Sequence, residues 1–185
     1  MRTLALFLLA GIPLCAQLTQ PVRLNPTRTL ATPASAMKIA PQTFKELERR
    51  FDNQLAGIGG PNDPIDLLGT TRGLYLDGYG AAFTTEVSLI ITPTVNPFHR
   101  EITKDEAARV HQRKLSRLPA LKQAMTEMLK NSAMTLIQIP DSQQIVVAVR
   151  LLYLPWEDTN GLPAQILLSA SRREVLNGQI KTEEQ

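Results

Sequence analysis

Apolar and polar positions alternate on both sides of residues 77–80, and this pattern predicts a β-hairpin. The alternation runs from Gly73 to Ile91, as expected for two antiparallel strands with one buried and one solvated side. Asp77-Gly78 is a strong short-turn signal because such a turn requires positive φ, and Gly80 adds a second permissive position. The buried side is expected to carry Leu74, Leu76, Ala81, Phe83, Val87 and Leu89, and the solvated side Tyr75, Thr84, Glu86 and Ser88.

A second hairpin is predicted from two further runs. Nearly every residue from Ile145 to Leu154 is apolar, which is typical of a central strand covered on much of both faces. Arg150 is the exception, and it requires water or a carboxylate partner. After a loop at residues 155–163, the run AQILLSAS supplies the second strand.

Three helices are predicted, each from a Ser or Thr followed three residues later by Glu. In such a capping box the two side chains satisfy free amide groups at the start of the helix. The pairs are Thr43 with Glu46, Thr103 with Glu106, and Ser171 with Glu174. Pro119 lies inside the second helical stretch. We expect it to kink or divide that stretch, because proline removes a helical hydrogen bond.

The resulting order, α-β-β-α-β-β-α, predicts an α+β domain of two layers. We expect a four-stranded antiparallel sheet, made of the two β-hairpins, packed against a central helix interrupted by proline. Further helices stand at the N- and C-terminal ends. The predicted domain covers residues 41–180, and residues 181–185 are expected to be a disordered tail.

The first 16 residues are typical of a secretory signal peptide. One charge at Arg2 precedes an apolar run from Leu4 to Leu14 and a small residue at Ala16. The run is too short to span a bilayer, which takes about 20 apolar residues. Lipid attachment at Cys15 is the less favoured alternative, because lipoprotein sites have a small residue where Leu14 stands. We therefore expect export to the periplasm or the medium, with no transmembrane segment after signal removal.

The amino-acid composition excludes several kinds of functional site. Residues 17–40 are rich in Pro, Thr and Ala and are expected to form a flexible lead. Cys15 is the only cysteine, so removal of residues 1–16 leaves no disulfide and no thiol chemistry. With two histidines a His-rich metal site is excluded, and we expect no metal or cofactor. The net charge of +3 and the 5% aromatic content argue against nucleic-acid binding.

The loop at Trp156 is the first candidate site. It places the only tryptophan beside Glu157, Asp158 and Asn160, and an aromatic next to hydrogen-bonding side chains is favoured in protein interfaces. The alternative is an ordinary turn, in which Asp158 and Asn160 serve the backbone and Trp156 covers the edge of the sheet.

Two further candidate sites are weaker. If His99 lies near Glu157 or Asp158, the pair could perform general acid–base catalysis in a hydrolase of unfamiliar type. The cations at four-residue helical spacing suggest a polyanion or membrane-surface site; they are Arg109, Arg113 and Arg117, with Lys114 beside them. A solvated helix face, with Asp105 pairing Arg109, explains the same spacing.

The runs GLYLDGYGAAFTTEVSL and LPAQILLSAS resemble a group of uncharacterised exported bacterial proteins with a G-Y-G-x-x-F-T strand pair. The resemblance covers most of residues 43–176 and implies a bacterial envelope location, but it carries over no functional residue. We therefore expect a non-enzymatic binding or accessory protein that contacts another envelope protein or a surface polymer. The sequence does not indicate an oligomeric state.

Overall fold

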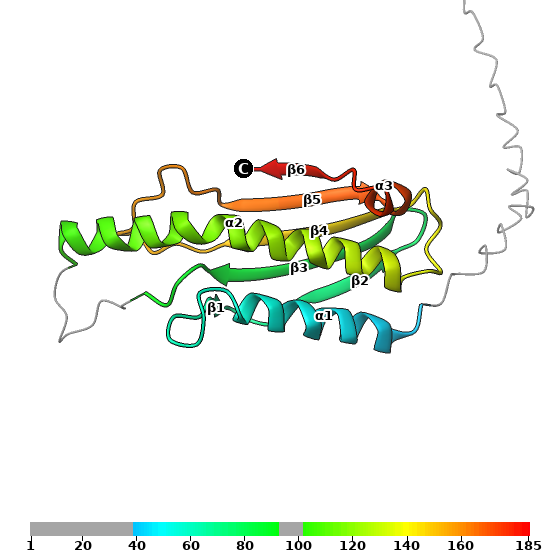
Figure 1. Ribbon diagram of the computed structural model, residues 1–185, viewed down its shortest axis with the longest axis horizontal. Coiled ribbons are helices and arrows are strands. Elements are labelled where there is room, and N and C mark those ends of the chain that lie inside the picture. Colours follow the sequence, from blue (N-terminus) through cyan, green and yellow to red (C-terminus); the bar gives the residue numbers. More distant parts are fainter. Residues whose placement is uncertain (1–38, 93–101) are drawn as a thin grey trace, which may run out of the picture. The chain divides into compact units, whose positions relative to one another are not determined.

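The computed structural model describes residues 39–92 and 102–185, so the predicted signal peptide and nearly all of the predicted lead lie outside the described residues. The helices and strands of the described part, in chain order, are α1 (Pro41–Ala56), β1 (Asp66–Leu67), β2 (Arg72–Leu76), β3 (Gly80–Ser88), α2 (Lys104–Thr135), β4 (Gln144–Leu151), β5 (Gln165–Ser171), α3 (Arg172–Leu176) and β6 (Lys181–Glu184) (Figure 1). The predicted α+β class is confirmed.

The sheet is mixed, and the prediction of a four-stranded antiparallel sheet was wrong. Its order is β1-β3-β4-β5-β6, and β2 pairs with β3 on the side that β1 also uses. The two predicted hairpins, β2–β3 and β4–β5, are antiparallel. However, β3 and β4 run parallel, with Ala81 opposite Ile145. The long helix α2 returns the chain to the end of the sheet where β3 begins, and a helical crossover of this kind is the usual connection between parallel strands.

Helix α2 continues through Pro119 as one helix of 32 residues, so Pro119 does not divide the stretch into two helices. Pro119 lies on the exposed side of the helix, whereas its neighbours Leu118 and Leu121 are buried. An interior proline costs about 3 kcal/mol. Burial of the apolar side chains on both sides of it offsets this cost, since each large one contributes about 1.5–3 kcal/mol.

The helix starts agree only partly with the predicted capping boxes. Ser171 and Glu174 form both bonds of the box at α3, and at α2 the Thr103 side chain accepts from the Glu106 amide. The box predicted at Thr43 was wrong, because α1 already begins at Pro41 and has no side-chain cap. Proline suits the first helical position, where its fixed φ fits and its missing N–H is not needed.

The hydrophobic core lies between the helices and one face of the sheet. Phe83 and Val87 are fully buried, as predicted, and Thr84 and Glu86 are exposed. The ring of Phe44 from α1 packs on that of Phe83, with the centroids 5.6 Å apart. The predicted central strand β4 contributes Ile145, Val147, Val149 and Leu151 to the same core.

The side chains of β2 face the opposite way from the prediction. Leu76 pairs with Gly80 and Leu74 with Ala82, so the connection is three residues long, at residues 77–79. The predicted faces correspond to a two-residue turn at Asp77-Gly78. A shift of one residue in the register turns every side chain of a strand to the other face. Tyr75 therefore packs against the core, while Leu74 and Leu76 are 42% and 46% exposed.

One edge of the sheet is formed by an additional strand, and the other edge is hydrogen-bonded to helix α1. The expectation of a disordered tail over 181–185 was wrong, because β6 pairs antiparallel with β5. At the other edge, Asp52 of α1 accepts hydrogen bonds from the amide and hydroxyl of Thr71, at 2.9 and 2.6 Å. One helical turn earlier, Glu48 accepts from the Gly73 amide at 2.6 Å. Helix α1 thus satisfies outward-facing amides that an edge strand otherwise leaves open.

Candidate functional site

One face of the sheet is covered by helices, and the other is covered by none of the described helices. Figure 1 shows α1 and α2 on the same side of the strands. The ring contact of Phe44 with Phe83 and the ion pair of Lys122 with Glu184 place both helices over the core-facing side. We call the opposite side the open face. Its residues, read from the register, are Arg72, Leu74, Leu76, Ala82, Thr84, Glu86, Gln144, Val146, Ala148, Arg150, Gln165, Leu167, Ser169, Lys181 and Glu183.

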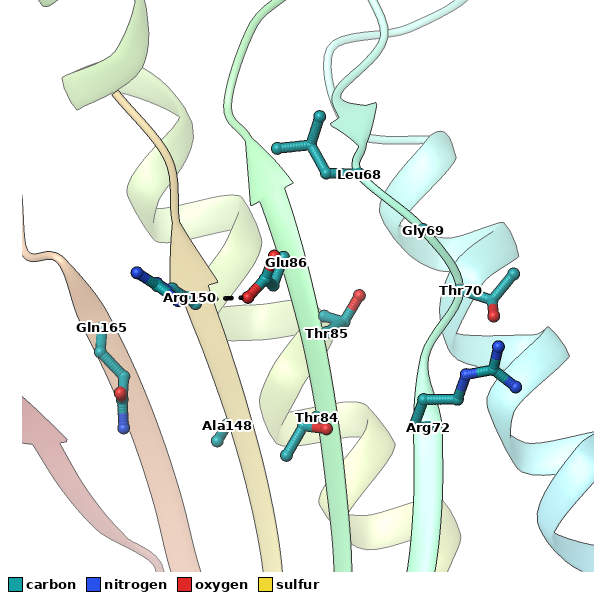
Figure 2. A pocket seen from close by; sticks show the side chains of 10 residues that line it. All are labelled: Leu68, Gly69, Thr70, Arg72, Thr84, Thr85, Glu86, Ala148, Arg150 and Gln165. Atoms are coloured by element: carbon teal, nitrogen blue, oxygen red, sulfur yellow. Dashed lines mark hydrogen bonds and ion pairs between the residues drawn. The ribbon is translucent and has the colours of Figure 1, made fainter. Parts of the chain in front are cut away.

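A groove of about 540 Å³ lies on this face, where β2, β3, β4 and β5 run side by side. Figure 2 shows its lining side chains, with Leu68 and Thr70 on the segment between β1 and β2 and Gln165 on β5. Residues of that segment line one side of the groove, and Thr84 and Ala148 line it on β3 and β4.

The charged groups of the groove are unevenly paired. Arg150 forms an ion pair with Glu86 at 3.4 Å, and both side chains are largely exposed. This is the carboxylate partner that the sequence required for Arg150. In contrast, the exposed guanidinium of Arg72 forms no ion pair with any described residue. Figure 2 shows it directed toward Thr70 rather than toward Glu86. Arg72 is therefore a cation available to a carboxylate from outside.

The exposed apolar residues of the open face lie on one side of it, on β2 and at the groove wall. Leu74 and Leu76 are more than two-fifths exposed, as is Leu68 at the groove wall. The half-buried Ala82, Ala148 and Leu167 continue the apolar positions across β3, β4 and β5, and Val146 between them is only 8% exposed. Apolar residues bordered by polar ones are common in protein interfaces.

The Trp156 loop is held against α2 instead of standing free. His111 Nδ1 lies 2.9 Å from the carbonyl oxygen of Asp158, and the Asp158 carboxylate accepts from the Asn160 amide at 3.0 Å. The latter contact is the turn-forming role that competed with the binding hypothesis. Trp156 itself is half-buried. The loop therefore presents less free hydrogen-bonding capacity than its composition suggests.

Glu157 is buried against Lys114, and only 1% of each side chain is exposed. Lys114 also lies over the Tyr153 ring, 4.9 Å from its centroid, and 3.5 Å from the carbonyl oxygen of Leu152. Burial, with a smaller contribution from Glu157, raises the pKa of Tyr153 to about 12. Tyr153 donates its hydroxyl to the carbonyl oxygen of Pro163 at 2.7 Å. This cluster attaches the loop to α2 and is closed to ligands.

The proposed acid–base pair is not assembled by the described residues. His99 lies outside them. Of its two suggested partners, Glu157 is committed to Lys114 and Asp158 to its own turn. No group of three or more His, Cys, Asp and Glu side chains within 39–92 and 102–185 could hold a metal ion.

The four cations of α2 do not form one exposed stripe. Lys114 and Arg117 are buried. Arg117 donates to the carbonyl oxygens of Leu89 and Asp63, each at 2.5 Å. The Asp63 carboxylate pairs with Arg113 and Arg117, and the Arg113 hydrogen bond is the main cause of its lowered pKa. Arg109 is exposed and donates to the carbonyl oxygen of Asp105 at 3.2 Å.

Sequence reasoning predicted a solvated side of the sheet but missed its exposed leucines, because it placed Leu74 and Leu76 in the core. The signal that could have revealed this is Tyr75, whose large aromatic ring suits burial better than the solvated side.

Among the described residues, no helix is both long and apolar enough to cross a membrane. No family model matches the chain, and searches of curated proteins and of solved structures return no match.

Proposed function

We propose that the chain is an exported, non-enzymatic binding or accessory protein of the bacterial envelope. In this proposal a partner protein binds at the open face, and not at the Trp156 loop that the sequence suggested. The observation that carries the proposal is the asymmetry of the sheet, which has helices on one face and exposed leucines beside polar residues on the other. Exposed apolar residues bordered by polar ones are typical of interaction sites.

The partner has a defined chemistry. It presents a carboxylate to Arg72, because that cation has no ion-pair partner within the described part of the chain, and it covers the exposed Leu74. A carboxylate suits this position well, since a guanidinium can bind it through two parallel hydrogen bonds. The ion pair of Arg150 with Glu86 remains at the rim, where charges contribute more to specificity than to affinity.

Site-specific photo-cross-linking in exporting cells tests the proposal. A photoreactive amino acid replaces Leu74 on the open face, or Arg50 on the exposed surface of α1 as the matched control position. We expect discrete protein adducts from position 74 only. Arg72→Glu should reduce their yield, whereas Arg49→Glu on α1 should not, because Arg49 is exposed and lies outside the face.

Two results would contradict the proposal. One is an equal set of adducts from positions 74 and 50, which would indicate nonspecific capture. The other is an adduct from position 74 whose yield is unchanged by Arg72→Glu, which would remove the carboxylate contact assigned to Arg72.

A further inference from the structure

We propose that the protein bound at the open face is a second copy of this chain, packed face to face about a two-fold axis parallel to the strands. The inference rests on the proposed function, because it uses the same face as the binding surface. It adds the identity of the partner and the residue pairs that join the two copies.

The register of the sheet places opposite charges at the two ends of one row. Arg72 on β2 is opposite Thr84, then Ala148, then Leu167, and the row ends at Glu183 on β6. All five side chains are on the open face. Glu183 is 41% exposed in its side chain and pairs only with its neighbour Lys181 among the described residues.

A row here means residues that are paired side by side across the sheet. A two-fold axis along β4 reverses the order of the strands in the second copy, and each row keeps its position along the strand direction. Arg72 of one copy then lies over Glu183 of the second copy, and symmetry repeats the contact at the other edge. The side chain of Ala148 lies on the axis and meets its equivalent. The face is therefore complementary to itself in charge along this row.

The neighbouring rows are compatible with the same axis. In one of them Leu74, Ala82, Val146, Ser169 and Lys181 follow one another across the sheet. Leu74 of one copy then lies over Lys181 of the second copy, whose methylene groups can cover it while the ammonium group stays in water. The side chains of this row are small in the middle, where two sheets approach to about 10 Å. In the other row Glu86 lies over Gln165 of the second copy. Arg150 meets its equivalent near the axis, but each copy neutralises its own Arg150 with Glu86.

Sheet twist does not abolish the match. Packed sheets cross at about 30°, and two strand spacings put Arg72 or Glu183 about 10 Å from the axis. The rotation displaces these positions by about 5 Å, which the long arginine side chain can span. The charge pairs at the edges are thus retained in an aligned packing of the two sheets.

The size of the face predicts a weak dimer. Five strands at ~4.8 Å spacing and rows that extend over ~20 Å give a face of roughly 500 Å². A standard interface uses about 800 Å² per partner. We therefore expect a monomer–dimer equilibrium that depends on concentration and is sensitive to each edge pair.

Charge exchange provides the test, measured by sedimentation velocity of the purified protein over a range of concentrations. Arg72→Glu and Glu183→Arg should each weaken association by about tenfold or more, because each creates two like-charge contacts per dimer. An equimolar mixture of the two variants should form a heterodimer, since every edge pair is again attractive. The variant with both changes should regain self-association.

The matched controls are Arg49→Glu and Glu46→Arg, exposed exchanges on α1 that should leave the dimer intact. Thermal unfolding of every variant verifies that it is folded. A wild-type protein that stays monomeric, or a dimer insensitive to both reversals, overturns the second-copy inference. If position 74 still cross-links to a different protein in an Arg72-dependent way, the proposed function stands without it.

Discussion

Lys114 of α2 and Glu157 of the loop between β4 and β5 are ion-paired in the interior, 43 residues apart along the chain. The removal of both charges from water carries a large desolvation cost, which their attraction offsets only when further hydrogen bonds are present. Glu157 Oε1 has no hydrogen-bond partner in the described residues. The pair therefore orients the loop more than it stabilises the domain.

Removal of one partner should be much more damaging than removal of both. Lys114→Met leaves a buried carboxylate alone, and we expect a loss of about 3–5 kcal/mol in the free energy of unfolding. Lys114→Met combined with Glu157→Leu should recover most of that loss. Urea unfolding measures both, with Lys130→Met on the exposed side of α2 as control. A double variant as unstable as the single one would contradict this view of the pair.

Gly80 and Gly78 should respond very differently to alanine. Both have positive φ, at +136° and +77°, but a Cβ on Gly80 would lie 1.9 Å from the carbonyl oxygen of Gln144, whereas Gly78 faces open space. We expect Gly78→Ala to cost about 1 kcal/mol from backbone strain alone. Gly80→Ala should cost at least several times more, because β4 must move away. Thermal unfolding would show the difference, and equal melting temperatures would refute it.

Asp52→Ala should expose the dependence of the sheet edge on α1. The change removes both hydrogen bonds of the nearly fully buried Thr71. Loss of a partner from a buried polar group costs about 1–3 kcal/mol. Chemical unfolding should show a loss in that range, and hydrogen exchange at the Thr71 amide should accelerate. Glu46→Ala, an exposed acid on the same helix, should change stability by less than about 0.5 kcal/mol.

Tyr153 should make the fold sensitive to alkali. Its pKa is about 12 in the folded chain, against an ordinary value near 10, because burial disfavours the phenolate. The unfolded chain thus releases this proton at lower pH. The stabilising contribution is complete below pH 10 and is lost as the pH rises toward 12. Unfolding midpoints measured across that interval should fall, and Tyr153→Phe should show a shallower fall if the assignment is right.

Local patterns predicted much of this fold. Alternation identified Phe83 and Val87 as core residues of β3, and Ser171 with Glu174 marked the start of α3. Each of these features depends on residues close together in sequence. The faces of β2 were missed because the turn at Asp77-Gly78 fits a two-residue or a three-residue connection equally well, and one residue decides the side.

Contacts between distant residues were beyond the sequence. Nothing in the sequence near Glu157 indicates that it pairs with Lys114. The same loop sequence is equally compatible with a solvated glutamate. The parallel pairing of β3 with β4 was missed although the order strand–helix–strand indicates it, because a long helix is the usual connection between parallel strands. A solvated side of the sheet was expected, but its exposed leucines were not, because the register of β2 was off by one residue.

The parallel seam between β3 and β4 has a kinetic consequence. Each hairpin can close within microseconds, since its strands are neighbours in sequence. The pairing of β3 with β4 can form only after α2 has brought Ile145 back beside Ala81, and such distant pairings form slowly. Until then each hairpin has an unpaired strand edge with apolar side chains, which favours aggregation. The yield of native protein should therefore depend on how rapidly α2 forms, even among variants with identical final structures.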